Sequence, residues 1–330
     1  MGAVGLQTHI WANNTRTVLL LAGFPVLLVL LMYGAQLILI GMGVIPGAGG
    51  DLGGDLVLSA EMLWRTVPLA VVAAGLWFVI AYLGNQAMID AMTGARKVDR
   101  TEEPELYNLL ENLAISRGMA VPTLRVIESP ALNAYASGLH AGRYSVTVTR
   151  GLMQALDRDE LEAVLAHELT HIINKDVRTM VIAAIFAGII TVVAELIFRG
   201  MLHVRGGSRN KSGGPLILIG FAIAGVGFAL ALVIRMTLSR TREYVADAGS
   251  VELTKNPDAM ISALRKVSGQ SRLKAPDEVQ GMFLDNQPDG GGIDAIFSTH
   301  PSIESRIAAL VEFAGGRDVA AYATAVPSTQ

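Results

Sequence analysis

Cysteine is absent from the sequence, and its absence narrows the chemistry that the chain can support. Without cysteine there are no disulfides and no thiolate ligands, so any metal site must be built from histidine, aspartate and glutamate. The absence permits a cytoplasmic domain, although it does not by itself require one.

Charged residues are also scarce, at 17% of the 330 residues, whereas hydrophobic residues make up 52%. This composition is too apolar for an ordinary soluble protein, yet it leaves enough charge for a folded aqueous domain. The net charge is -3 and no long cluster of lysine and arginine is present, so no nucleic-acid partner is expected. The composition therefore favours a protein that is partly embedded in a lipid bilayer.

Four stretches carry almost no charge, and each has roughly the 20 residues that a membrane-spanning helix needs. They are 17–45, 67–92, 178–199 and 215–236. The first lacks the cleavage-site pattern of a secretory signal peptide, so we expect it to remain as an anchor. The last two are predicted to form a membrane hairpin.

The charges beside these stretches predict an orientation. The segment 47–63 contains acidic residues and no lysine or arginine, whereas basic residues gather at 96–100, after the second stretch. The positive-inside rule therefore places the chain after residue 92 in the cytoplasm. The connector of the hairpin, 199–214, is itself basic, and the same rule would prefer it in the cytoplasm. Whether the hairpin crosses the bilayer completely stays open at this point.

The remaining segments have the patterns of a folded domain with helices and a small sheet. The predicted strands are 123–128 and 143–149, and the predicted helices are 105–119, 158–176, 239–268 and 302–313. Asp157 and Glu160 form a capping pair in front of the second helix. Asn256 and Pro257 interrupt the third.

The segment His167-Glu168-Leu169-Thr170-His171 lies in the predicted helix 158–176 and carries the strongest chemical signal. Its two histidines are one helical turn apart on one face, so both imidazoles can reach a single zinc ion. Glu168 is placed to act on the water that such an ion activates. We therefore predict one zinc ion per subunit, with Glu168 as general base and general acid.

A catalytic zinc ion needs a third protein ligand and an open fourth position. Glu243 is the candidate, although it and Asp247 could also be two solvated carboxylates on a charged helix. The position of Glu243 in the chain favours its role as a metal ligand. His171 and Glu243 are each separated from the neighbouring apolar stretch by a distance of about 15 Å along a helix. A membrane hairpin between them would return the chain to the same height, which predicts catalysis near the lipid surface.

Several motifs resemble those of the HtpX family of membrane zinc peptidases. They are HELTH at 167–171, SRTREYVADAGS at 239–250, NAYASG at 133–138 and THPS at 299–302. The resemblance covers about residues 106–310, and the type I CAAX prenyl protease of the same clan shares HExxH and the later glutamate. It implies a zinc metalloendopeptidase of the bacterial inner membrane that cleaves misfolded or damaged membrane proteins at the cytoplasmic face, as protein quality control.

The expected fold is a mainly α membrane protein with four transmembrane helices and a cytoplasmic α+β zincin-like (gluzincin) catalytic domain with a small sheet. The expected parts are an N-terminal membrane region 1–97, a first catalytic part 98–176, a hairpin 177–238, a second catalytic part 239–314 and a flexible tail 315–330. The expected partners are polypeptide substrates, which we expect to be membrane proteins, and the lipid bilayer. No pattern predicts an oligomeric state.

Further residues receive roles in or near the site. Asp247 could orient a zinc-bound histidine, because such histidines commonly donate their other N–H to a carboxylate. His300 could stabilise the oxyanion or, equally, pack at the start of a helix. By resemblance, Asn133 and the strand containing Ser145 and Thr147 would bind an extended substrate by strand addition. An ordinary turn and strand is the alternative.

Two other functions compete with proteolysis. A membrane-anchored metal-binding scaffold would need the ligands but not Glu168, so the intact glutamate argues against it. A metal transporter would have ionisable residues near the middle of several spans, and the predicted spans are nearly free of charge. Within the peptidases, a prenyl protease would need a chamber made by more than four spans.

Overall fold

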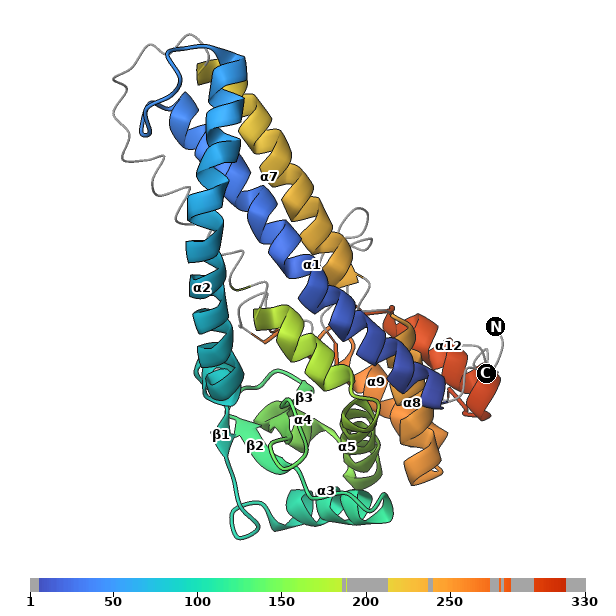
Figure 1. Cartoon of the computed structure of the whole chain (residues 1–330). Helices are drawn as coiled ribbons and strands as arrows, with labels where there is room; N and C mark the ends of the chain where they lie inside the picture. Colours follow the sequence, from blue (N-terminus) through green and yellow to red (C-terminus); the bar gives the residue numbers. More distant parts are fainter. Residues whose placement is uncertain are drawn as a thin grey trace. The chain divides into compact units, whose positions relative to one another are not determined.

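A computed structural model describes residues 6–185, 188, 213–236, 240–273, 279, 282–285 and 300–318 (Figure 1). The chain divides into two compact units. The helical unit comprises Thr15–Leu83 and Ile182–Thr237, as far as these residues are described. The sheet unit comprises Gly84–Val181 and Leu238–Gln330 together with Met1–Asn14, with the same restriction.

Three long helices are described in or entering the helical unit. They are α1 (Leu6–Gly41), α2 (Leu52–Thr93) and α7 (Gly213–Met236). Two of them, α1 with its stretch Ala22–Gly41 and α2, are long and apolar enough to cross a membrane. In α7, the apolar stretch among the residues whose side chains the structure describes is Gly213–Gly227. Of the four predicted transmembrane helices, the first two therefore correspond to candidate membrane spans by length and composition.

The structure describes the other predicted spans to different extents. The stretch 215–236 does form a helix, α7. Most of 178–199 lies outside the described residues, although 176–185 are helical. The second span differs at its start, because α2 begins at Leu52 and not near residue 67. Hydropathy marks only the apolar core of a helix, whereas the helix itself continues through the acidic residues before it.

Glycines bring α1 and α7 into close contact. A Cβ on Gly220 would lie 2.8 Å from the carbonyl oxygen of Gly34, and one on Gly41 would lie 2.8 Å from that of Gly213. The two helices therefore run antiparallel, side by side (Figure 1). Gly213, Gly220 and Gly227 recur every seven residues, which is close to two helical turns, so they share one face. Small residues at such an interface are typical of helix packing in membranes.

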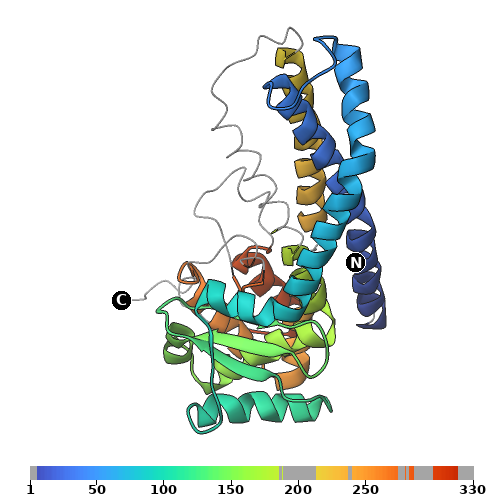
Figure 2. The same ribbon diagram turned by 60° about the vertical axis from the view of Figure 1, so that its left-hand side comes forward.

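A four-stranded sheet forms part of the sheet unit (Figure 2). Its strands are β1 (Arg96–Lys97), β2 (Thr123–Ile127), β3 (Ala134–Ser137) and β4 (Ser145–Thr149), in the order β1-β2-β4-β3. β2 and β4 are parallel, and the other two pairs are antiparallel. The predicted strand 143–149 contains β4, and all residues of β4 are buried. β4 is thus an internal strand.

Six further helices lie in the described part of this unit, besides the end of α2 and the helical residues 176–181. They are α3 (Pro104–Ser116), α4 (Arg150–Ala155), α5 (Arg158–Ile173), α8 (Thr241–Thr254), α9 (Pro257–Val267) and α12 (Ile303–Ala314). Asn256 ends the interruption between α8 and α9 by accepting a hydrogen bond from Ala259 N, which confirms the predicted break. Neither α4 nor β3 was predicted.

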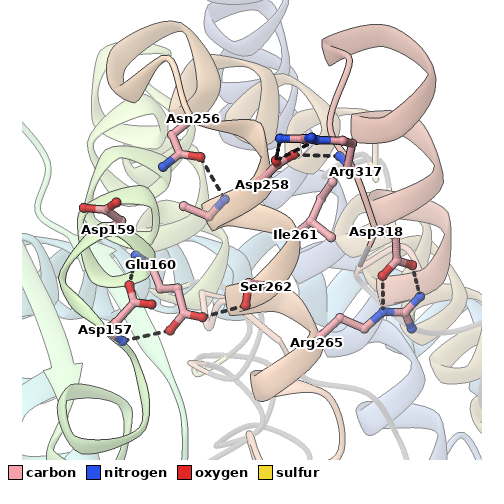
Figure 3. A pocket seen from close by; sticks show the side chains of 11 residues that line it. Asp157, Asp159, Glu160, Asn256, Asp258, Ile261, Ser262, Arg265, Arg317 and Asp318 are labelled. Carbon is pink, nitrogen blue, oxygen red and sulfur yellow. Dashed lines mark hydrogen bonds and ion pairs between the residues drawn. The ribbon is translucent and has the colours of Figure 1, made fainter. Parts of the chain in front are cut away.

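The start of α5 is fixed by the predicted capping pair. Asp157 accepts from the N–H of Glu160 at 2.9 Å, and Glu160 accepts from the N–H of Asp157 at 2.8 Å (Figure 3). The same Glu160 carboxylate accepts hydrogen bonds from Ser262 and Lys266 of α9, each at 2.6 Å. The cap of α5 therefore also fastens α9 to it.

The first residues of the predicted flexible tail 315–330 are held in place. The backbone N–H of Arg317 donates to Asp258 at 2.6 Å, and Arg265 pairs with Asp318 at 2.5 Å (Figure 3). These residues line a cavity of about 320 Å³ beside the N-terminal end of α9. Residues 319–330 lie outside the described residues, and the flexibility of the tail stays a prediction.

α5 and α8 approach each other closely. A Cβ on Gly249 would lie 2.3 Å from Cγ2 of Thr170, so no larger residue fits between the helices without a shift. Next to it, Ser250 donates to the carbonyl oxygen of Ala163 at 2.6 Å. This contact sets the separation of the two helices that carry the predicted metal ligands.

Candidate metal centre

His167, His171 and Glu243 meet in the interior of the sheet unit, although α5 supplies the first two and α8 the third. The Nε2 atoms of the two histidines are 3.1 Å apart. Oε2 of Glu243 lies 3.5 Å from Nε2 of His167 and 3.7 Å from Nε2 of His171. All three side chains are buried. The three ligand atoms thus form one compact triangle.

This triangle fits a metal ion. Zinc bonds of about 2.0–2.1 Å in tetrahedral geometry place neighbouring ligand atoms roughly 3.3–3.4 Å apart, close to the three distances above. Oε2 of Glu243 is buried and has no hydrogen-bond partner among the described residues. A buried, unpartnered carboxylate oxygen is costly unless a cation satisfies it. The three residues could therefore hold a metal ion.

The electrostatics of the cluster also favour a cation. Burial by itself lowers the pKa of His171, but the carboxylates of Glu243 and Asp176 raise it to about 10. Burial raises the pKa of Glu243, but the imidazoles of His300 and His171 hold it well below its usual range. Carboxylates that attract a proton to His171 also attract a divalent cation to the same position.

A carboxylate faces the second nitrogen of each histidine. Oδ1 of Asp247 lies 2.9 Å from Nδ1 of His167, the arrangement that the sequence predicted for Asp247. Oδ2 of Asp176 lies 3.0 Å from Nδ1 of His171, and Asp176 was not among the predicted site residues. In both pairs the carboxylate can accept from Nδ1–H, which leaves the Nε2 lone pair for the metal.

Arg306 of α12 holds Asp247 and was missed by the sequence analysis. Its Nη2 donates to Oδ1 of Asp247 at 2.6 Å and its Nε donates to Oδ2 at 2.9 Å. A third donor, Nη1, reaches the carbonyl oxygen of Leu284 at 2.9 Å. The side chain is 1% exposed. Such a bidentate pair fixes the position and the charge of the carboxylate.

The sequence did contain a signal for Arg306. The buried residues of α12 are Ile303, Arg306, Ile307 and Leu310, which follow the spacing of an apolar helix face. An arginine in the middle of such a face must be buried, and a buried arginine must have an anionic partner.

Glu168 is 1% exposed, and its Oε1 has no hydrogen-bond partner among the described residues. Burial raises the pKa of its carboxyl group, and the neighbouring imidazoles of His167 and His171 oppose this effect only in part. An unengaged carboxylate beside two metal ligands is free to exchange a proton with a molecule bound there.

His300 lies at the edge of the cluster. Its Nε2 is 3.7 Å from Oε1 of Glu243. Burial lowers the pKa of His300 to about 4 in spite of the nearby Glu243, so its imidazole is neutral at pH 7. A neutral imidazole has one N–H, and it can therefore donate one hydrogen bond.

Asn133 does not offer its side chain to the centre. Its amide nitrogen donates to the carbonyl oxygens of Ser271 and Asp285, at 2.7 and 3.0 Å. Its Oδ1 accepts from the N–H groups of Ala134 and Leu284, at 2.9 and 3.0 Å. Two donors and two accepted bonds use the capacity of the amide, and the residue is 1% exposed. The structure therefore gives no support to the predicted role of Asn133 in substrate binding.

Contrary to the prediction from the sequence, Ser145 and Thr147 cannot pair with an added substrate strand. Both residues lie on β4, which is paired with β2 on one side and β3 on the other, so it has no free edge. β3 is the outer strand on this side. Its residues, Ala134–Ser137, show no regular alternation of apolar and polar side chains, so the sequence did not predict a strand there.

Comparisons with known proteins are in accord with this geometry. The sequence model of peptidase family M48 matches residues 100–314. A protein described as a protease HtpX homolog from Bacteroides fragilis is 39% identical over 324 residues, which are 95% of this chain and 100% of the relative. A homolog of the same description from Lactobacillus helveticus is 32% identical over 313 residues, with 92% and 98% covered.

One solved structure, the crystal structure of S. mikatae Ste24p, is similar with a TM-score of 0.42 and 20% sequence identity. The similarity covers 91% of this chain and 66% of that protein.

Proposed function

This chain belongs to peptidase family M48, as one of its HtpX proteases. We propose that it uses zinc to hydrolyse peptide bonds of membrane proteins. Its family makes it a metalloprotease that acts on polypeptides, and α1 and α2 fit a membrane protein. The metal is one zinc ion per subunit, held by His167, His171 and Glu243. The triangle of two imidazole nitrogens and one carboxylate oxygen carries this proposal, because it is a zinc ligand set that leaves a fourth position open.

The chain's own residues divide the work of hydrolysis. When bound, zinc would act as a Lewis acid on the scissile carbonyl and make a water molecule acidic at neutral pH. Glu168 accepts the proton of the attacking water and later transfers it to the leaving amine. Asp247, held by Arg306, fixes the imidazole of His167. The N–H of neutral His300 donates a hydrogen bond to the oxyanion.

We place the substrate backbone along β3 in place of β4. The N–H of Thr149 donates to the carbonyl oxygen of Asn133 at 3.0 Å, so residue 133 faces β4. Because successive residues of a strand alternate in direction, the backbone groups of Ala134 and Ala136 face away from β4. Those of Ala134 are already engaged, because its N–H donates to Oδ1 of Asn133 at 2.9 Å and its carbonyl oxygen accepts from the N–H of Leu284 at 2.8 Å. We therefore propose Ala136 as the residue of β3 that pairs with the substrate. An extended peptide that pairs with this edge is bound through its main chain, which suits unfolded chains of many sequences.

The substrates are misfolded or damaged membrane proteins, cut at the cytoplasmic face of the bacterial inner membrane. The basic residues after α2 and the apolar length of α1 and α2 support this orientation. The apolar stretches 178–199 and 215–236 would add a hairpin between the two catalytic parts, 98–176 and 239–314, and bring the number of spans to four. The N-terminal membrane region is then 1–97.

Cleavage of casein tests the catalytic proposal. The detergent-purified protein, with zinc restored, should cut casein, whereas Glu168→Gln should bind zinc and be slower by about 10²–10⁴-fold. Glu162→Gln is the matched control, because the same change is made on the same helix outside the metal cluster. A native protein that binds zinc and cuts no unfolded protein would instead favour the metal-binding scaffold.

The substrate class needs a separate test. The reporter is a membrane protein with a destabilised transmembrane domain, compared with its stable parent and with casein. The destabilised form should be cut faster than the parent. If casein is cut and both membrane reporters stay intact, quality control of membrane proteins is the wrong role.

The absence of cysteine makes the orientation simple to test, because no background labelling occurs. Val44 and Ile115 are both exposed, Val44 after α1 and Ile115 on α3. In intact cells a membrane-impermeant maleimide should label Val44→Cys from outside and should label Ile115→Cys only after lysis. The opposite pattern would invert the proposed topology.

A further inference from the structure

We propose that Asp176 is a positioning residue for the second metal-binding histidine, and that the left-handed turn at Lys175 serves to bring it there. The proposal rests on the proposed function in one respect, that His171 binds the metal. Asp176 lies outside the sequence motifs from which the site was predicted.

The chain changes direction immediately after the metal-binding helix. α5 ends at Ile173, Asn174 is still right-handed, and Lys175 has a φ of 62°. A side chain with a Cβ is disfavoured in this left-handed region, which glycine normally occupies. Residues 176–185 are helical again. A lysine kept in this conformation indicates that the surrounding contacts hold the turn.

The turn changes what Asp176 can reach. In an unbroken α-helix, position 176 would be rotated by about 140° from His171, because each residue advances by about 100°. Asp176 would then point to a different face of the helix. With the turn, its Oδ2 lies 3.0 Å from Nδ1 of His171. The departure from helical geometry is thus what makes the pair possible.

The pair determines the direction of the imidazole of His171. Both side chains are buried, with 6% and 3% of their surfaces exposed, so water does not compete for Nδ1. A carboxylate that accepts from Nδ1–H selects the tautomer whose Nε2 lone pair faces the metal cluster. Asp176 thereby does for His171 what Asp247 does for His167 at 2.9 Å.

The two carboxylates are held by different parts of the chain. Asp247 is held by Arg306 of α12, within the sheet unit. Asp176 opens the helical segment 176–185, which passes from the sheet unit into the helical unit after Val181. The geometry of one metal ligand is thus tied to the first residue of the segment that leaves the catalytic part of the chain.

The experiment measures metal binding and not only proteolysis, with full-length protein in detergent. Asp176→Ala should weaken zinc affinity by about 10–100-fold in a chelator competition, as is usual when a histidine loses its carboxylate. It should also change the visible absorption bands of the cobalt-substituted protein. Asp176→Asn should lose less, because its amide oxygen can still accept from Nδ1–H. Asp159→Ala, an exposed change at the start of α5, should leave both measurements unchanged.

Lys175 tests the role of the turn independently of the carboxylate. Lys175→Gly should keep native zinc affinity and raise stability, because glycine adopts this conformation without cost. Lys175→Ile should weaken zinc affinity as Asp176→Ala does, since a β-branched residue strongly resists a positive φ. If Asp176→Ala fails to fold, the zinc affinities of Lys175→Gly and Lys175→Ile still show whether the turn positions His171.

Two outcomes would overturn the proposal. One is native zinc affinity and an unchanged cobalt spectrum in Asp176→Ala, and the other is native affinity in Lys175→Ile. Failure of the proposed function is seen elsewhere, as a zinc-loaded native protein that does not cut casein. In that case the affinities of the variants still decide the role of Asp176.

Discussion

The two units of the chain hold their helices together by different means. In the sheet unit, charged side chains join the helices in pairs: both partners are buried in Arg306–Asp247, and the carboxylate is buried in Lys266–Glu160. In the helical unit, α1 and α7 meet at glycines, with backbone against backbone. Contacts of the second kind are those expected of helices in lipid, where the hydrophobic effect contributes little to the association of apolar helices and close packing contributes more.

Polar contacts in the helical unit are neutral where they join α1 to α2. Gln36 donates to Thr66 at 2.7 Å, and Tyr33 donates to the carbonyl oxygen of Leu56 at 3.2 Å. Many apolar side chains of α2 are exposed, as expected of a helix that faces lipid. We therefore expect single substitutions to have different consequences in the two units.

The largest effect on stability should come from Arg306→Met in the sheet unit. The change leaves the carboxylate of Asp247 buried without its cation, and breaking a buried ion pair in this way costs about 3–5 kcal/mol. Denaturant titration of the full-length protein in detergent, followed by circular dichroism, measures the free energy of unfolding. Arg317→Met is the control, because its pair with Asp258 is exposed to solvent and should contribute little. Equal losses in the two variants would show that buried charge pairs do not dominate this unit.

An intermediate effect is expected for Gly220→Ala in the helical unit. The added methyl group would lie 2.7 Å from Cγ1 of Ile38 and 2.8 Å from the carbonyl oxygen of Gly34, so α1 and α7 must move apart. Overpacking of this kind costs about 1–3 kcal/mol. Gly225→Ala adds the same group to the same helix where nothing lies within 4 Å, and it should be tolerated. If thermal unfolding in detergent shows the two variants to be equally stable, the glycine contact does not hold this unit together.

The smallest effect is expected for Tyr135→Phe, which removes a neutral hydrogen bond in the sheet unit. The hydroxyl of Tyr135 lies 2.9 Å from Oγ1 of Thr93, and both groups are buried. A hydrogen bond between neutral groups contributes about 0.5–1.5 kcal/mol. Tyr107→Phe, in which a half-buried ring is changed in the same way, serves as control in the same titration. A loss as large as that of Arg306→Met would mean that charge is not what distinguishes the contacts of this unit.

Much of the metal centre was predictable because its ligands belong to a short list of residue types. With no cysteine in the chain, His167 and His171 at helical spacing required a further histidine or a carboxylate, and Glu243 was proposed from its position relative to the apolar stretches. The capping pair at 157–160 predicted the start of α5, since its two hydrogen bonds are local. Local spacing was sufficient for these features.

The remaining features depend on contacts or backbone angles that spacing does not contain. Asp176 faces His171 only because Lys175 is left-handed, and no periodic pattern predicts that conformation. The position of β4 inside the sheet follows from pairing with β3, whose sequence lacks the alternation typical of a strand. Arg306 was predictable from the apolar face on which it lies, but its partner Asp247 comes from another helix.

The ligand triangle also has a consequence for the newly synthesised protein. His167 and His171 leave the ribosome long before Glu243, and Arg306 follows later still. A chain that stops between the histidines and Glu243 has two imidazoles and no third ligand, which is not enough for a catalytic zinc site. Truncated products ending at residue 212 should therefore bind zinc weakly and cut nothing. Synthesis itself thus delays the appearance of protease activity until the second catalytic segment has been made, which protects the unfinished chain and its neighbours.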